Sequence, residues 1–235
     1  MRHEALALFE QGLKSRYDLD VIVGIDEAGR GALAGPVYAG ACAITDPSGT
    51  MFINDSKLLS QRQREQAFEL LPAHALFATG SSTAAEIDAQ GILHATYKAM
   101  EKALLLLLPE VRERWGTGAR IGVVIDGPLL PPFLEAEEKL IAMAIIDADA
   151  TVLSVAGASI AAKVSRDAAM RAMARHVHGY GFEGNFGYGT HEHIEALRVK
   201  GPSGEHRRTF VVKQLAETEE LPLGRTTHPD PRKHR

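Results

Sequence analysis

The sequence predicts an α/β domain in which helices cover both faces of a mixed β-sheet. Short apolar runs rich in β-branched residues alternate along the chain with longer segments whose apolar residues recur at helical spacing. Two of these runs, 21–26 and 37–44, are joined by a glycine-rich turn, and this connection favours a mixed sheet. The length of 235 residues suits one domain with a small appendage.

The first half of the chain is expected to alternate strands with helices. The strands are apolar runs bounded by glycine or polar residues, and the helices show apolar residues every three or four positions. Ser60 supplies an N-cap for one helix, and Gly91 breaks another. In order, the predicted elements are a helix over 4–13, strands over 21–26 and 37–44, a helix over 62–71, a strand over 75–79 and a helix over 86–108.

The second half continues the alternation and then changes in composition. Gly127 and Pro128 close one continuous apolar run, and an aspartate closes the next. These elements are strands over 121–126 and 142–146, a long helix over 155–176 and a shorter one over 190–199. From 215 onward the chain is polar and rich in proline, so we expect a domain over 1–214 and a flexible tail over 215–235.

The distribution of charge is uneven. The net charge is −4, which taken alone argues against a nucleic-acid partner. Residues 1–162 hold 13 basic and 21 acidic side chains, whereas residues 163–214 hold 9 basic and 5 acidic ones. An acidic body beside a basic segment indicates either a solvated mixture of charges or a metal site next to a strip that binds a polyanion.

The composition also favours a location in the cytoplasm. Cys42 is the single cysteine, so an internal disulfide and a cysteine zinc site are excluded, and a reducing compartment is suitable. The first ten residues lack the apolar region of a signal peptide. The richest apolar run, 103–108, is far shorter than the ~20 residues needed to span a bilayer.

Acidic residues stand at the ends of three predicted strands. Asp26 and Glu27 end the first strand, Asp126 ends the strand over 121–126, and Asp149 follows the last one. Ligands of open α/β sheets gather beyond strand ends, and oxygen donors without cysteine select hard ions such as Mg²⁺ or Mn²⁺. Asp147 shares a face with Asp149 by the strand period of two, so periodicity leaves both as candidates.

A turn is the alternative explanation for these acids. Asp126 before Gly127 and Pro128 is, by itself, more typical of a turn than of a metal ligand. Asp26 and Glu27 are neighbours whose side chains point to opposite faces of a regular strand, so they serve one site only if the chain bends immediately afterwards. The glycines of segment 28–31 provide such a bend and allow close approach to a ligand.

Other motifs are interpreted more conservatively. The glycine segment 29–35 resembles a dinucleotide fingerprint, but its last glycine is misplaced and two carboxylates precede it, so we expect no nucleotide cofactor. The pairs at 176/178 and 191/193 have the spacing of histidine metal ligands but lack further ligands. We interpret them as surface or anion-contacting histidines.

The basic segment contains residues suited to phosphate and base contacts. Ser159, Lys163 and Arg166 form a polar stripe on the long helix, which is most often a solvated face but here follows a candidate metal ligand. Tyr188, together with Arg207 and Arg208, adds an aromatic ring and cations that could grip a nucleic-acid backbone. Two rival classes are a non-catalytic nucleic-acid-binding module, which leaves the acids unexplained, and an enzyme acting on small phosphoesters, which leaves the basic segment unexplained.

Several ordered motifs between residues 20 and 214 resemble those of bacterial ribonuclease HII. They are Gly24-Ile-Asp-Glu-Ala-Gly-Arg-Gly31, Asn54-Asp-Ser-Lys57, Glu86-Ile-Asp88, Ile92-Leu-His-Ala-Thr96, Ile125-Asp-Gly127, Ala158-Ser-Ile-Ala-Ala-Lys-Val-Ser-Arg-Asp167, Gly187-Tyr-Gly-Thr190 and His206-Arg-Arg-Thr-Phe210. The first block followed by the block at 158–167 is highly specific.

The resemblance implies an RNase H-like fold with a small C-terminal helical part. It also implies an endonuclease that cleaves RNA in RNA/DNA hybrids and nicks duplex DNA 5′ of embedded ribonucleotides, leaving 3′-hydroxyl and 5′-phosphate ends. Two divalent ions, Mg²⁺ or Mn²⁺, would be its cofactors. The family's roles would be removal of RNA primers and ribonucleotide excision repair, and we expect a monomer.

The resemblance also assigns residues. The catalytic, metal-binding carboxylates fall on Asp26, Glu27, Asp126 and Asp149. The substrate-binding positions are Gly29, Arg30 and Gly31 in the loop that reads the 2′-hydroxyl, Tyr188 at the sugar, and Ser56, Lys57, Ser159, Lys163, Arg166, Arg207 and Arg208.

The chain departs from the family pattern in two places. Members often carry Lys-Gly-Asp where this chain has Asp147-Ala-Asp149, and a proline where it has Gly189. The short helix before residue 20 disfavours the sister class that has an additional N-terminal substrate-binding domain.

Overall fold

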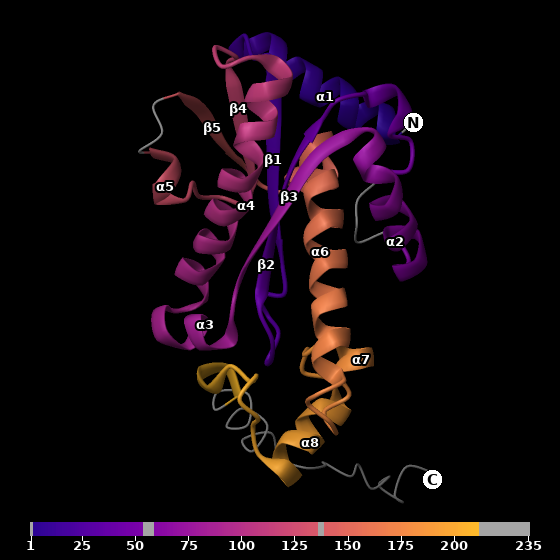
Figure 1. Ribbon diagram of the computed structural model, residues 1–235, viewed down its shortest axis with the longest axis vertical. Coiled ribbons are helices and arrows are strands. Elements are labelled where there is room, and N and C mark those ends of the chain that lie inside the picture. The colour runs from indigo at the N-terminus through magenta and orange to yellow at the C-terminus, as the bar shows by residue number, and fades with distance from the viewer. Residues whose placement is uncertain (1, 54–58, 136–138, 212–235) are drawn as a thin grey trace, which may run out of the picture.

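A computed structural model describes residues 2–53, 59–135 and 139–211, and within them the expected alternation of strands and helices is present (Figure 1). The strands are β1 (Val21–Ala28), β2 (Val37–Ile44), β3 (Ala75–Ser82), β4 (Ile121–Asp126) and β5 (Leu140–Ile145). The helices are α1 (Arg2–Tyr17), α2 (Gln61–Leu70), α3 (Ala84–Gln90), α4 (Ile92–Trp115), α5 (Pro132–Glu135), α6 (Leu153–Ala174), α7 (Phe182–Asn185) and α8 (His191–Lys200), with short 3₁₀ turns at Pro47–Gly49, Leu71–Ala73 and Ala148–Ala150. The tail expected over 215–235 lies outside the described residues.

The described strands form one mixed sheet in the order β3-β2-β1-β4-β5, which confirms the predicted fold class. β2 runs antiparallel to both β1 and β3, whereas β1, β4 and β5 are parallel to one another. The register pairs Ile25 with Ile125 and Asp126 with Ile145, so the carboxyl ends of the three parallel strands lie level at one edge. Acids that follow these strands are thereby brought to the same place.

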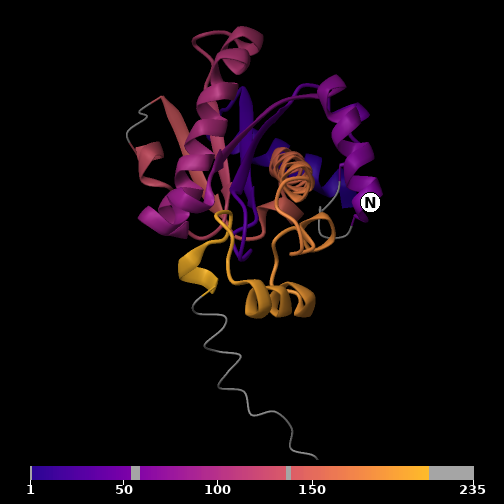
Figure 2. The same cartoon turned by 60° about the horizontal axis from the view of Figure 1, so that its bottom comes forward.

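Two long helices cover the sheet on opposite faces (Figure 2). α4 packs its buried leucines and alanines against β3 and β2, and α6 packs against β1 and β2. α6 comes very close to the strands because glycines face it: a Cβ at Gly24 would lie 2.2 Å from the backbone nitrogen of Val155, and one at Gly40 would lie 2.2 Å from the carbonyl oxygen of Ala158. Figure 1 shows α6 continuing beyond the sheet to the C-terminal helices α7 and α8.

The helix predicted over 86–108 is broken at Gly91 as expected, but its end at 108 is wrong. The chain continues as α4 through Pro109 to Trp115. Proline removes only the hydrogen bond to the carbonyl of Leu105, and Leu105 lies on the exposed side of the helix, where water can replace the lost donor. Burial of Leu108 and Val111 in the core holds the last turns in place.

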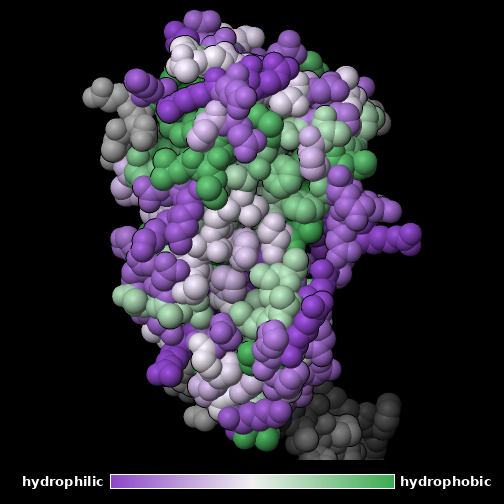
Figure 3. All heavy atoms as spheres, viewed as in Figure 1, coloured by the Kyte–Doolittle hydropathy of each residue, from purple (hydrophilic) through white to green (hydrophobic). Residues whose placement is uncertain are grey.

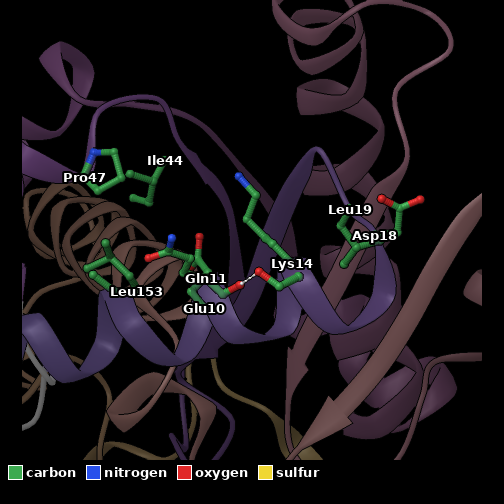
Figure 4. A pocket seen from close by; sticks show the side chains of 10 residues that line it. Glu10, Gln11, Lys14, Asp18, Leu19, Ile44, Pro47 and Leu153 are labelled. Carbon is green, nitrogen blue, oxygen red and sulfur yellow. Dashed lines mark hydrogen bonds between the residues drawn. The ribbon is translucent and has the colours of Figure 1, made fainter.

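The N-terminal helix anchors α6. Val152, at the N-cap position of α6, makes no side-chain capping bond, and the Glu10 carboxylate of α1 instead accepts a 2.6 Å hydrogen bond from the Ser154 amide. Burial raises the pKa of Glu10. Beside it lies a cavity of about 560 Å³, between α1 and residues such as Ile44 and Leu153 (Figure 4).

Within the described part of the chain, none of the helices has the length and apolar character needed to cross a membrane. Apolar side chains gather in the upper half of one face, with hydrophilic ones along its edges (Figure 3). α4 contributes exposed leucines, Leu105 and Leu106.

The close approach of α6 to β1 generates a stability prediction. Gly24→Ala should lower the free energy of unfolding by about 1–3 kcal/mol, because the new methyl group meets helix backbone that cannot move away cheaply. Gly118→Ala is the control, since a Cβ there meets open space. Urea unfolding of both variants measures the difference, and equal stability of the two would contradict the packing described above.

Candidate metal centre and substrate cleft

Three aspartates from three parts of the sheet edge converge. Asp26 lies near the end of β1, Asp126 ends β4, and Asp149 lies in the 3₁₀ turn that follows β5. Each offers a carboxylate oxygen, and these oxygens all lie within 4.8 Å of one another. Among the described residues this is the one group of three or more His, Cys, Asp and Glu side chains with the spacing of a metal site.

Two aspartates of the cluster are buried, and bringing the three charges together is electrostatically unfavourable. Asp26 and Asp149 are only 6% and 1% exposed. Burial raises the pKa of Asp26 well above its ordinary value, and the charges of Glu27 and Asp126 raise it further. Hydrogen bonds from the Ser159 hydroxyl and the Glu27 amide oppose this shift only in part.

The chemistry of this donor set fits hard divalent cations. All three ligands are carboxylates, without sulfur or imidazole, and a bound cation would offset their mutual repulsion. Asp126 is already oriented by the Ala148 amide, which donates a 2.8 Å hydrogen bond to its carboxylate. The site is therefore suited to Mg²⁺-like ions rather than to zinc.

The structure distinguishes the two aspartates that the sequence left open after β5. Asp147 has a left-handed backbone (φ 55°) and an exposed side chain at the start of the turn. That conformation places the turn so that Asp149, two residues later, is buried in the cluster. Asp149, not Asp147, thus lies with Asp26 and Asp126.

Glu27 stands beside the cluster. Its carboxylate accepts a 2.9 Å hydrogen bond from Arg30, whose side chain is half exposed. The expected bend follows at Gly29, with φ +92°, where a Cβ would lie 1.8 Å from the Nε atom of Arg166. Position 29 therefore requires glycine for two reasons: its φ is positive, and the Arg166 side chain leaves no room for a Cβ.

A cavity of about 320 Å³ opens over these carboxylates. Its walls come from β1, β4, α2, α6 and the turn that carries Tyr188. The lining residues are Asp26, Glu27, Ala28, Gly29, Arg64, Asp126, Ser159, Lys163 and Tyr188. Acidic ligands on the floor and cationic or aromatic side chains on the walls suit a phosphodiester with bound cations.

Arg64 was missed by the sequence analysis. It lies in α2, where it looks like one more exposed arginine of a polar helix, and its guanidinium donates to the carbonyl of Leu59. Only the folded chain brings α2 to the cavity. Ser56 and Lys57 lie outside the described residues, so their expected role stays a prediction.

Tyr188 is held by cations. The guanidinium of Arg166 lies 5.1 Å from the centre of its ring, and the ammonium of Lys163 lies 5.5 Å from it. Lys163 also pairs with Asp167 at 2.8 Å. The ring is thereby fixed at the edge of the cavity next to a cation that can meet a phosphate.

The predicted phosphate contacts of Arg166 and Arg207 are wrong. Both were predicted to touch phosphates, yet both are 0% exposed. Arg166 donates to the carbonyls of Pro36, Phe186 and Ala34, and Arg207 donates to those of Gly35 and Arg30. Burial, with the nearby charge of Arg166, lowers the pKa of Arg207 to about 9. The two arginines fasten the glycine loop from behind and do not reach the surface.

The other predicted contacts have mixed positions. Arg30, Gly31 and Arg208 are exposed. The backbone amide of Arg208 donates to Asp88 of α3 at 2.8 Å, which fixes this part of the chain against the sheet domain. The histidine pair at 191/193 was interpreted as a surface or anion-contacting pair, but His193 is 0% exposed, and that interpretation is wrong for it.

Comparison with known proteins identifies the family of this chain. The family model described as Ribonuclease HII matches residues 23–213. A Ribonuclease HII from Geobacillus sp. (strain WCH70) is 42% identical over 212 residues, which are 89% of this chain and 69% of the relative. A Ribonuclease HII from Burkholderia pseudomallei (strain 1710b) is 40% identical over 194 residues, which are 81% of this chain and 83% of the relative.

Solved structures show the same fold. The ribonuclease HII in the PCNA complex from Archaeoglobus fulgidus has a TM-score of 0.61 at 24% identity, covering 86% of this chain and 98% of that one. Bst-RNase HIII, crystallised with Mn²⁺, has a TM-score of 0.59 at 18% identity, covering 85% and 70%. With the family match over most of its length, the chain belongs to the ribonuclease HII family, a family of endonucleases that hydrolyse phosphodiester bonds.

Proposed function

We propose that this protein cleaves the RNA strand of RNA/DNA hybrids and nicks duplex DNA 5′ of embedded ribonucleotides, leaving 3′-hydroxyl and 5′-phosphate ends. The observation that carries the proposal is the cluster of Asp26, Asp126 and Asp149 within 4.8 Å, of which Asp26 and Asp126 line a cavity that Lys163 and Tyr188 also line. The family match supports the same activity.

The carboxylates would hold the cofactor. Asp26, Asp126 and Asp149, with Glu27 beside them, would bind two Mg²⁺ or Mn²⁺ ions. When bound, these ions supply the positive charge that favours in-line attack by water and departure of the 3′-oxygen. Ser159 and the Ala148 amide keep two of the carboxylates in position before substrate arrives.

The glycine loop would recognise the ribonucleotide. The side chain of Arg207 donates a hydrogen bond to the carbonyl of Arg30. The N–H of Gly31 belongs to the same peptide unit and points in the opposite direction. This amide would bind the 2′-hydroxyl, the group that distinguishes RNA from DNA. Tyr188 would pack against the sugar next to the junction, and Lys163 would contact a phosphate.

The oligomeric state, location and cellular role belong to the same proposal. The protein would act as a monomer in the cytoplasm, in the removal of RNA primers and in ribonucleotide excision repair. The exposed side chains of Arg30 and Arg208 would add contacts to the nucleic-acid backbone.

The carboxylate cluster predicts which acids are essential. Asp126→Asn and Asp149→Asn should each lower cleavage at least about a hundredfold, because each removes a charged ligand from the cluster. Asp147→Asn is the matched control two residues away, and it should retain activity. The assay uses duplex DNA with one ribonucleotide, an RNA/DNA hybrid and a chromogenic phosphoester, in Mg²⁺ and in Mn²⁺. Near wild-type cleavage by Asp126→Asn, or turnover of the phosphoester alone, would overturn the proposal.

Tyr188 should matter more for cleavage than for general DNA binding. Tyr188→Ala removes the ring held by Arg166 and Lys163 and should reduce nicking at a lone ribonucleotide about ten- to a hundredfold. Tyr188→Phe keeps the ring and should stay close to wild type. Affinity for ribonucleotide-free duplex, measured by fluorescence anisotropy, should change little; an equal loss of both quantities would argue against a role at the sugar.

The electrostatics predict that metal promotes DNA binding. The carboxylates repel a phosphate backbone until cations neutralise them, so affinity for ribonucleotide-free duplex should rise when Mg²⁺ replaces K⁺ at constant ionic strength. Divalent ions also compete with the protein for the DNA phosphates. Asp149→Asn serves as the control for this competition, because its carboxylate cluster carries less negative charge and its binding should respond less to Mg²⁺. Binding by the wild type that is indifferent to Mg²⁺ would contradict this account.

A further inference from the structure

Two buried histidines lie behind the cleft, outside the set of residues that line it. His193 of α8 is 0% exposed, and His206, in the segment that follows α8, is 2% exposed. Their Nε2 atoms are 3.0 Å apart. The rings of Tyr180 and Phe182 pack around the pair at centroid distances of 4.6–6.3 Å.

The hydrogen bonds of this pair have one direction. The Ser203 amide can only donate, and it lies 2.9 Å from Nδ1 of His206, so this Nδ1 is an acceptor and the proton of His206 is on Nε2. Nε2–H of His206 then donates to Nε2 of His193. The proton of His193 is on Nδ1, which donates to the carbonyl of Tyr188 at 2.8 Å.

The chain of hydrogen bonds requires both rings to be neutral. A protonated His193 would turn its Nε2–H toward the Nε2–H of His206 across 3.0 Å, and a protonated His206 would turn its Nδ1–H toward the Ser203 amide across 2.9 Å. Burial lowers the pKa of both histidines, that of His206 to about 4. At neutral pH the directed arrangement is therefore the stable one.

One end of the chain of hydrogen bonds lies on the turn that carries Tyr188. The other end belongs to the segment that fastens the glycine loop: His206 forms a β-bridge with Ala34, and the carbonyl of Glu205 accepts the Gly35 amide at 2.8 Å. The next residue, Arg207, donates its side chain to the carbonyl of Arg30. The two histidines thus join the two elements to which the proposed function assigns the sugar and the 2′-hydroxyl.

We propose that His193 and His206 are positioning residues that set the place of Tyr188 relative to the glycine loop, and thereby the selectivity for a ribonucleotide. This inference rests on the proposed function, because it requires Tyr188 and the loop to contact the substrate. Neither histidine touches substrate or the carboxylates. Gly189 follows Tyr188 without the backbone restriction of a proline. The hydrogen bond from His193 to the Tyr188 carbonyl therefore has more backbone freedom to restrict.

The test separates positioning from folding. His193→Phe alone leaves the buried N–H of His206 without its acceptor and should destabilise the protein. The double variant His193→Phe/His206→Phe removes both ends of the hydrogen bond between the rings and keeps the ring shapes. It also removes the acceptor of the Ser203 amide, but Ser203 is only half-buried and water can replace that acceptor, so the melting temperature should stay closer to that of the wild type. We expect the double variant to lose about ten- to a hundredfold in kcat at a lone ribonucleotide, with Mg²⁺ binding by calorimetry unchanged. Glu192→Gln, an exposed change on α8, is the control.

A double-mutant cycle with Tyr188→Ala makes the two possible failures distinguishable. If the histidines act through Tyr188, the double variant should cause no further loss once Tyr188 is alanine. The positioning role is wrong if Tyr188→Ala lowers kcat but the folded double histidine variant does not. It is also wrong if the kcat losses of Tyr188→Ala and of the double histidine variant add fully when the changes are combined. If Tyr188→Ala itself has no effect, the proposed role of Tyr188 fails first.

Nuclear magnetic resonance of the wild-type chain gives a readout that does not depend on any variant. Long-range ¹H–¹⁵N spectra at pH 7 should show His206 as the Nε2–H tautomer and His193 as the Nδ1–H tautomer. The opposite tautomers, or a protonated ring in either residue, would overturn the proposal even if the phenylalanine variants failed to fold.

Discussion

Mutual repulsion among the buried carboxylates is the constraint on which the rest of the structure depends. Oxygens of Asp26, Asp126 and Asp149 within 4.8 Å are unfavourable without cations, and the protein must hold them there before any ion binds. The parallel register of β1 and β4 fixes two of them at one level, and a left-handed residue, Asp147, turns the chain so that the third is buried. The rigid backbone thus holds the three carboxylates together against their mutual repulsion.

α6 connects that cluster with the elements that we propose to face the substrate. Ser159, Lys163 and Arg166 occupy one stripe of the helix, but each meets a different environment: a ligand carboxylate, the cleft, and the carbonyls behind the glycine loop. Such a division of roles requires the helix to be placed accurately. Glycines at its contact with the sheet and the Glu10 cap at its N-terminus provide that placement.

The sequence predicted what local patterns determine. The alternation of hydrophobic runs along the chain and the glycine turn predicted the mixed sheet. The acids at the strand ends predicted the carboxylate cluster. It could not choose between Asp147 and Asp149, because the strand period does not describe the irregular turn in which they lie. The expected solvent exposure of Arg166 was wrong for a related reason: segments distant in sequence, near Pro36 and Phe186, cover it. Burial by non-local segments leaves no periodic signal.

The burial of Arg166 and Arg207 changes the meaning of the charge distribution. Both were counted in the basic segment that faces a nucleic acid, yet their charges lie beneath the glycine loop and bind its carbonyls. They release no counterions from DNA, so they would not contribute to the salt dependence of binding, whose slope is about −0.9 per phosphate neutralised. Their electrostatic effect is instead local: buried positive charge behind a loop, in a medium of low dielectric, favours an electronegative group held at its front. Under the proposed function, affinity for the nucleic-acid backbone would depend on a few exposed cations within the described residues, whereas the buried arginines would act on recognition of the ribonucleotide.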